Sequence, residues 1–460
     1  MEYGYRNRGS RATGVAGVAR VTFPIHSLHG GHVLSGLRIV RLLPAAWVIH
    51  ALGVLSAAAP APARAQASES VVERAQRVHA AVITIDTHAD IPFNFGTSEY
   101  NACNALNRQV DVPKMRAGGL DAAFFIVYVG QAERTPETYA AARAGAMQKF
   151  AGIRRMTTEL CPELIELAYT ADDVERIHAA GRLVAAIGIE NGFVMGRDLS
   201  ALAEFHALGG RYMSLTHNGH NDLADSWLAD ARLGDDGPEH GGLSALGEAV
   251  VAEMNRLGIM VDVSHASKAT VLDLARVSRA PLIASHSGVR AIARTERNMD
   301  DEMMLALART GGVMQTVALG SFVRDMPQER QAAIQALRAE FDIGQGRRRA
   351  QDLSAAERER YAAGMAEIEA RWAPVTVAEF VDNIDYAVRL MGIDHVGISS
   401  DFDGGGGVAG WGSAAETFNV TLELVRRGYT DEEIRKLWGG NLLRVWRAAE
   451  RVAAELQAGN

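Results

Sequence analysis

Residues Ile83–Asp90 read ITIDTHAD, a short β-branched and aliphatic run that ends in two residues able to bind a metal, His88 and Asp90. Such a run is typical of a strand buried on both faces of a parallel sheet. Side chains two apart on a strand share a face, so His88 and Asp90 can reach one ion. A single His-x-Asp pair is nevertheless more often a structural hydrogen bond than a metal site.

Four further short apolar runs carry a polar residue of the same kind at or near their ends. They are Val184–Glu190 (VAAIGIE), Tyr212–His217 (YMSLTH), Met260–His265 (MVDVSH) and Pro281–Ser287 (PLIASHS). Taken one at a time, Glu190 fits a carboxylate that is paired or faces solvent, and His265 and His286 fit hydrogen-bonded core histidines. Together with His88 and Asp90 they place five ligand-type groups at the ends of four strands. That combination favours a metal site at the C-terminal mouth of a barrel.

The number of strand-like runs predicts the fold class. Three more such runs are Leu120–Val129, Gly312–Ala318 and His395–Asp401, which makes eight. Helix-like segments alternate with them, for example Leu243–Leu257, for which Gly258 can serve as C-cap. We therefore predict an α/β protein with a (β/α)8 TIM barrel.

One long segment departs from that alternation. Residues Arg324–Trp372 are charged and mostly helix-like, and they lie between the seventh and eighth predicted strands. Because the segment belongs to a loop that follows a strand, we expect it on the active-site side of the barrel. We predict a helical insertion that serves as a lid or as the contact of a homodimer.

The first 65 residues are predicted to lie outside the barrel. Arg38 and Arg41 precede the apolar stretch Leu42–Pro60, and Ala63-Arg64-Ala65 follows as a small-x-small cleavage site. This order is that of a secretory signal peptide over about 38–65, cleaved after Ala65. The alternative is a retained membrane anchor, although the stretch is short for a bilayer span. We expect an exported protein, periplasmic or secreted, with no stable membrane span after cleavage and one barrel domain over residues 67–455.

Composition and charge bear on the partners. The chain has 460 residues, of which 48% are apolar and 22% charged, as in a soluble globular protein. A formal net charge of −8 gives no reason to expect nucleic acid or an anionic membrane as a partner. The two cysteines, Cys103 and Cys161, are too few for a zinc–thiolate cluster. They form one disulfide in an oxidising compartment or remain two thiols, and the sequence leaves both open.

The ligand types narrow the choice of metal. Imidazole and carboxylate without thiolate suit Zn²⁺, with Co²⁺ or Mn²⁺ as substitutes. Five ligands exceed the three that a single catalytic zinc needs. The economical solution is a pair of ions bridged by one carboxylate, since a carboxylate has two oxygens and a neutral imidazole cannot bridge.

Seven motifs, THAD, GIENG, LTHN, DVSH, ASHS, RN-x-DD and SDFDG, resemble in order and spacing the membrane dipeptidase (renal dipeptidase) family of the amidohydrolase superfamily. The resemblance runs from about Val82 to Val445. It implies a (β/α)8 barrel, a binuclear zinc centre and hydrolysis of dipeptides, often with tolerance of a D-residue at the C-terminal position.

The resemblance assigns the metal ligands by motif. His88, Asp90 and a bridging Glu190 would hold one zinc ion, and Glu190, His265 and His286 would hold the other. A hydroxide shared by the two ions would attack the scissile carbonyl of the substrate.

The resemblance also assigns three residues to the dipeptide substrate. His217 of LTHN would donate a hydrogen bond to the oxyanion, although by itself it also fits a histidine bonded within its loop. Arg297 of ERNMDD would bind the free carboxylate, because a guanidinium fork fits a carboxylate. Asp401 of SDFDG would meet the ammonium group and carry a proton as acid/base. Asp403 is expected to be structural, and the glycines at 404–407 to let the chain turn tightly.

Two positions depart from the family. Phe193 stands where some members carry a histidine, and the seventh strand, GVMQTVALG, lacks the tyrosine of the mammalian enzyme. Both leave the metal ligands intact but leave the side-chain preference for substrate open.

Two other functions are compatible with parts of this pattern. One is another binuclear-metal hydrolase of the superfamily, acting on a lactone, a β-lactam or an amidine. The other is a barrel that binds without catalysis, which the intact set of ligands argues against.

Overall fold

The computed structural model describes residues 69–343 and 353–459, and within them one sheet forms the centre of the fold. Eight parallel strands follow one another in the order β1-β2-β4-β5-β6-β7-β8-β9. The strands are β1 (Ile85–Asp90), β2 (Ala122–Tyr128), β4 (Leu183–Glu190), β5 (Gly210–Ser214), β6 (Met260–Asp262), β7 (Ile283–Ser287), β8 (Val313–Val317) and β9 (Val396–Ser399). A backbone hydrogen bond of 2.8 Å from the amide of Asp90 to the carbonyl of Phe402 joins the first strand to the chain after the last. The predicted (β/α)8 barrel is therefore confirmed.

The predicted strands are confirmed, with differences at their ends. β5 ends at Ser214 and β6 at Asp262, so His217 and His265 lie in the loops that follow rather than on the strands. A ninth strand, β3 (Ile165–Leu167), pairs with β4 outside the ring. It escaped the sequence analysis because three residues are too few to show a periodicity.

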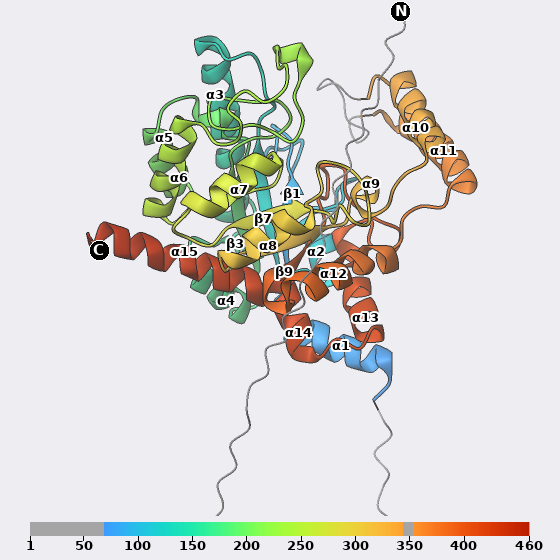
Figure 1. Ribbon diagram of the computed structural model, residues 1–460. Coiled ribbons are helices and arrows are strands. Elements are labelled where there is room, and N and C mark those ends of the chain that lie inside the picture. Colours follow the sequence, from blue (N-terminus) through green and yellow to red (C-terminus); the bar gives the residue numbers. More distant parts are fainter. Residues whose placement is uncertain (1–68, 344–352, 460) are drawn as a thin grey trace, which may run out of the picture. The chain divides into compact units, whose positions relative to one another are not determined.

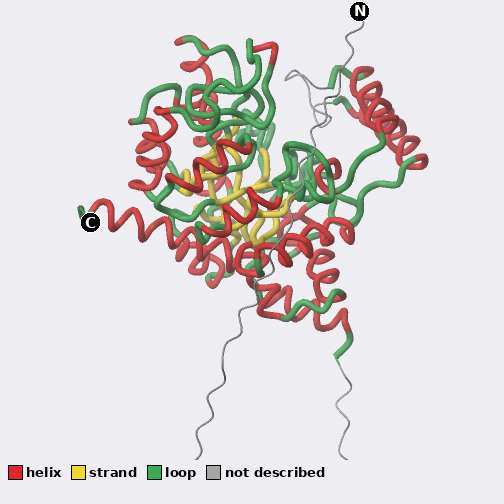
Figure 2. The backbone as a smooth tube through the Cα atoms, viewed as in Figure 1, coloured by secondary structure: helices red, strands yellow, loops and turns green. Residues whose placement is uncertain are grey.

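Helices surround the ring of strands, as Figures 1 and 2 show. In the first half of the chain they are α1 (Val71–Ala81), α2 (Val112–Gly118), α3 (Pro136–Arg155), α4 (Ala171–Ala179), α5 (Ser200–Ala207), α6 (Ala245–Leu257) and α7 (Lys268–Val277). In the second half they are α8 (Asp301–Arg309), α9 (Gly320–Val323), α10 (Gln328–Glu340), α11 (Ala355–Arg371), α12 (Val377–Met391), α13 (Phe418–Arg426), α14 (Asp431–Arg435) and α15 (Asn441–Gln457). Gly258, at φ 80°, ends α6 as the sequence predicts, and Ser244 caps its start.

Two hydrophobic clusters hold the barrel together. The larger one fills the space between the strands and the surrounding helices. The smaller one collects strand residues such as Phe124, Tyr212, Met260 and Ile283, together with side chains of α15. The rings of Phe124 and Trp446 of α15 lie 5.6 Å apart, so the C-terminal helix packs against the barrel strands through this cluster.

The predicted insertion between β8 and β9 is helical. Helices α10 and α11 lie side by side and away from the strands (Figure 1). They share a small hydrophobic cluster of their own, built around Phe341, Ile343 and Leu353. Residues 344–352, within this insertion, lie outside the described residues. Its role as a lid or as a dimer contact stays a prediction.

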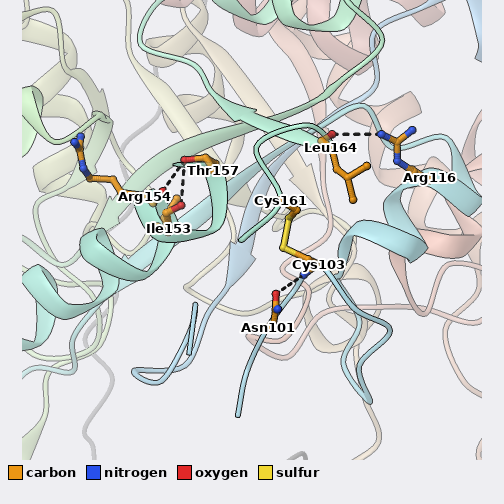
Figure 3. The surroundings of a disulfide bond; sticks show 8 residues. All are labelled: Asn101, Cys103, Arg116, Ile153, Arg154, Thr157, Cys161 and Leu164. Atoms are coloured by element: carbon orange, nitrogen blue, oxygen red, sulfur yellow. Dashed lines mark hydrogen bonds between the residues drawn. A yellow bond between two sulfur atoms is a disulfide. The ribbon is translucent and has the colours of Figure 1, made fainter. Parts of the chain in front are cut away.

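Cys103 and Cys161 form a disulfide, which decides between the two alternatives that the sequence leaves open. The bond ties the loop after β1 to the end of the turn that follows α3 (Figure 3). The predicted signal peptide falls on residues outside the described part of the chain. Across residues 69–343 and 353–459, no helix is both long and apolar enough to span a bilayer.

Candidate metal centre

The five predicted metal ligands come together at the C-terminal mouth of the barrel. His88 and Asp90 lie on β1, Glu190 ends β4, His286 lies on β7, and His265 follows β6 by three residues. Each of the five side chains is at least nine-tenths buried. The strands thus gather three imidazoles and two carboxylates from four places in the sequence at one buried position.

Glu190 lies between two groups of imidazoles. Its Oε2 is 3.7 Å from Nε2 of His88. Its Oε1 is 3.1 Å from Nε2 of His265 and 3.5 Å from Nε2 of His286. A carboxylate that offers one oxygen to each side has the arrangement that a bridging ligand needs.

Two predicted substrate residues lie within ligand distance of the same centre. Three groups have ligand atoms within 4.8 Å of one another: His88, Glu190 and His286; Glu190, His217 and His265; and His88, Asp90 and Asp401. His217 and Asp401, which are predicted to contact substrate and not metal, therefore border the centre directly.

The protonation states of His265 and His286 favour the binding of a metal cation. Burial lowers the pKa of His265 and of His286 well below the usual range, so both rings are neutral and offer a lone pair. Burial alone would lower the pKa of His88 too, but the surrounding Glu190, Asp90 and Asp401 raise it to about 9. An oxygen of Asp90 is also buried without a hydrogen-bond partner among the described residues. The neutral rings of His265 and His286, together with this buried oxygen of Asp90, fit a divalent metal ion, because buried charges need partners.

The backbone beside the centre is strained. His265, Asp401 and Asp403 have positive φ angles of 66°, 58° and 61°, and Asn191, next to Glu190, has 75°. Residues other than glycine rarely adopt positive φ angles, and each such conformation costs about 1–3 kcal/mol. Each of these residues lies just after a strand of the barrel. The unusual φ angles therefore change the direction of the backbone next to the ligand-type side chains.

Asp86 and Asp403 are bound within the protein, as expected of structural groups. Asp86 accepts hydrogen bonds from the amides of His88 and Ser400 and from the Ser400 hydroxyl. Asp403 accepts from the amides of Gln109 and Val110.

His217 lies over the centre as the outermost of its histidines. Its ring stacks on the ring of His265 with centroids 4.1 Å apart. The hydroxyl of Tyr128, the last residue of β2, is 3.4 Å from Nδ1 of His217. Tyr128 is not among the predicted site residues, although it lies next to the end of the predicted strand Leu120–Val129.

Arg297 lies beside the centre, and its guanidinium group already donates hydrogen bonds within the protein. It is 3% exposed, and its two terminal nitrogens donate to the hydroxyl of Ser287 and the carbonyl of His286. Its Nε is buried without a partner among the described residues, and its guanidinium lies 5.5 Å from the ring centre of Phe322. Arg297 therefore supports the end of β7, and its binding of a substrate carboxylate stays a prediction.

Gly404 approaches the centre more closely than the sequence analysis recognised. A Cβ atom on this residue would overlap a carboxylate oxygen of Asp90 and another of Asp401. The neighbouring Gly405 and Gly407 have φ angles of 145° and 104°, which confirms the tight turn predicted at 404–407. Only a glycine at position 404 leaves the two carboxylates in place.

A parallel (β/α)8 barrel with imidazole and carboxylate groups at its C-terminal mouth defines the class of metal-dependent hydrolases. The family described as membrane dipeptidase (peptidase family M19) matches residues 72–460, and the chain belongs to this family. The protein is accordingly a metallo-dipeptidase.

Individual relatives agree with this assignment. Dipeptidase aclJ of Aspergillus oryzae is 33% identical over 357 residues, which cover 76% of this chain and 72% of that protein. The crystal structure of the probable dipeptidase PvdM from Pseudomonas aeruginosa is 33% identical, with a TM-score of 0.73, and the match covers 83% of this chain and 99% of that one. A metallo peptidase from Rhodobacter sphaeroides, liganded with a phosphinate mimic of L-Ala-D-Ala, shares the fold at 23% identity and a TM-score of 0.60, over 80% of this chain and 99% of that one.

Replacing Gly404 with alanine should weaken metal binding about ten-fold or more, because the new methyl group displaces Asp90 and Asp401. The measurement is metal content after dialysis against buffers of fixed free Zn²⁺. Gly412→Ala is the matched control, since the nearest atom to a Cβ there is 3.4 Å away. Equal metal content in the two variants would contradict the close approach of Gly404.

Proposed function

We propose that the protein hydrolyses dipeptides with the help of two Zn²⁺ ions, for which Co²⁺ or Mn²⁺ can substitute. His88, Asp90 and Glu190 hold one ion, and Glu190, His265 and His286 hold the other. The observation that carries this proposal is the position of Glu190, whose two oxygens face imidazoles on opposite sides. When bound, a pair of such ions supplies an activated water at neutral pH and polarises the scissile carbonyl.

Asp401 moves the proton. Burial raises the pKa of its carboxyl well above the usual range, and Asp90 and Glu190 nearby add to the effect. A carboxyl group with a raised pKa can take the proton of the attacking water and then deliver it to the leaving amine.

His217 stabilises the oxyanion. The Tyr128 hydroxyl can donate to Nδ1 of His217, which leaves the proton of the neutral ring on Nε2. That N–H then donates to the oxygen on which negative charge develops in the tetrahedral state. Burial lowers the pKa of His217, which keeps the ring neutral.

The two free ends of the substrate set its length. Arg297 binds the carboxylate, and Asp401 meets the ammonium group, so a longer peptide has no place for its additional residues. We also propose that a D-residue is accepted at the C-terminal position, in line with the family that the seven motifs resemble.

We further propose that the protein is exported and that its signal peptide is cleaved after Ala65. The order of charged, apolar and small residues before this point supports the proposal, as does the disulfide, since such bonds persist in oxidising compartments.

Export with signal-peptide cleavage predicts a defined N-terminus for the mature protein. N-terminal sequencing of material from outside the producing cytoplasm should start at Gln66. Material that still begins upstream of Leu42 would show that the segment is kept.

The zinc-loaded protein should cleave members of a panel of L-L and L-D dipeptides and lose that activity in the presence of a chelator. Addition of Zn²⁺ should restore the activity, because the ions supply the activated water. Cleavage that survives complete removal of metal, or no cleavage of any dipeptide, rules out the proposed function.

Arg297→Ala should lower kcat/KM for dipeptides about a hundred-fold, because it removes the partner of the substrate carboxylate. A neutral lactone or a dipeptide amide has no such carboxylate, so its turnover should change little. If dipeptide and neutral substrate lose activity equally, Arg297 acts only by supporting the end of β7, and another substrate class of the superfamily is favoured.

A further inference from the structure

The phenol of Tyr212 lies inside the barrel directly beneath His88. Tyr212 is fully buried on β5, and its hydroxyl donates a 2.9 Å hydrogen bond to the carbonyl of Thr87. The same hydroxyl oxygen is 3.0 Å from Nδ1 of His88. The carbonyl can only accept, so the single phenol proton goes to Thr87 and the oxygen accepts from Nδ1–H of His88.

This hydrogen bond fixes which ring nitrogen of His88 is free. With the proton on Nδ1, the lone pair of the neutral ring lies on Nε2. Nε2 is the atom that faces the centre, at 3.7 Å from Glu190 and 3.9 Å from Asp90. The tautomer favoured by Tyr212 is thus the one that can bind a metal at this position.

The phenol has little freedom to move away. Tyr212 pairs with Gly188 of β4, and a Cβ atom at that glycine would overlap the tip of the Tyr212 ring. The ring also packs on Phe124 with centroids 5.3 Å apart. The strand pairing and the missing side chain at Gly188 therefore hold the hydroxyl against His88.

His286 is held in a separate way. Its Nδ1 is 2.9 Å from the hydroxyl of Ser285, which donates a 2.6 Å hydrogen bond to Asp262. The same logic places the proton on Nδ1 and the lone pair on Nε2 of His286. The hydrogen bond from Tyr212 thus serves His88 and that from Ser285 serves His286, while the two histidine rings lie 3.8 Å apart.

We propose that Tyr212 is a positioning residue that sets the occupancy of one of the two metal positions, the one held by His88 and Asp90, while Ser285 and Asp262 serve the other. The inference rests on the proposed two-ion centre. Loss of a hydrogen bond to the far nitrogen of a ligating histidine typically lowers metal affinity 10–100-fold. Since the hydrogen bonds of Tyr212 and Ser285 go to different histidines, that loss should fall mainly on one ion.

The experiment is a titration with Zn²⁺ alone, in buffers of graded free zinc, that counts the ions bound to each chain. The wild type should bind two. Tyr212→Phe should bind one with unchanged affinity and the second 10–100-fold more weakly, and Ser285→Ala should do the same for the other ion. The double variant should then bind both ions weakly, because each hydrogen bond serves a different histidine.

Two comparisons exclude a general effect on the structure. Tyr429→Phe, which removes a hydroxyl bonded to Asp385, is the matched control and should bind zinc as the wild type does. In a His88→Ala background, Tyr212→Phe should have no further effect on the remaining ion, because its effect passes through His88.

The outcomes separate the two proposals. A wild type that binds fewer than two ions overturns the two-ion centre. A wild type with two ions, together with a Tyr212→Phe variant that binds both as tightly, overturns the role of Tyr212. If that variant does not fold, the ¹⁵N signals of His88 in the zinc-loaded wild type decide: Nδ1 must carry the proton, and zinc bound to Nδ1 contradicts the inference.

Discussion

The burial of the Glu190 carboxylate among histidines is the interaction on which this barrel mouth depends. A carboxylate that is 3% exposed is costly unless charges or hydrogen bonds compensate it. His88 on one side and His265 and His286 on the other lie within 3.1–3.7 Å of its oxygens. Those three residues come from β1, β7 and the loop after β6, so the ends of these strands have to meet at β4.

Two deeper carboxylates hold the strand ends in that position. Asp86 accepts from the amides of His88 and Ser400, which ties β1 to the chain after β9. Asp262 accepts from the amides of Ser264 and Ser285, which ties β6 to β7. β6 and β7 share only one paired register position, and side-chain hydrogen bonds take the place of the missing ladder there. β6 can therefore end at Asp262, and His265 in the loop that follows adopts the positive φ angle with which its ring faces Glu190.

The sequence predicts the strands because burial on both faces leaves uninterrupted apolar runs such as VAAIGIE before Glu190. It also identifies the polar groups at the ends of these runs as candidate ligands, since a buried charge needs a compensating partner. It does not predict Tyr212 as a partner of His88, because that hydrogen bond crosses the barrel between residues 124 positions apart. The same holds for Gly404, which reads as a turn glycine until its distance to Asp90 is known. Local periodicity reports which face is buried, and not which side chains meet across the barrel.

The disulfide contributes to the position of Asp401 through the loop that contains Cys103. Cys161 holds the loop that contains Cys103, and a few residues further on Gln109 accepts from the amide of Asp403 and donates to the carbonyls of Gly406 and Gly412. This loop therefore clamps both sides of the turn that presents Asp401 and Gly404 to the centre. The disulfide restrains the same loop from its other end, so the covalent bond and the hydrogen bonds of Gln109 together hold the turn that carries Asp401.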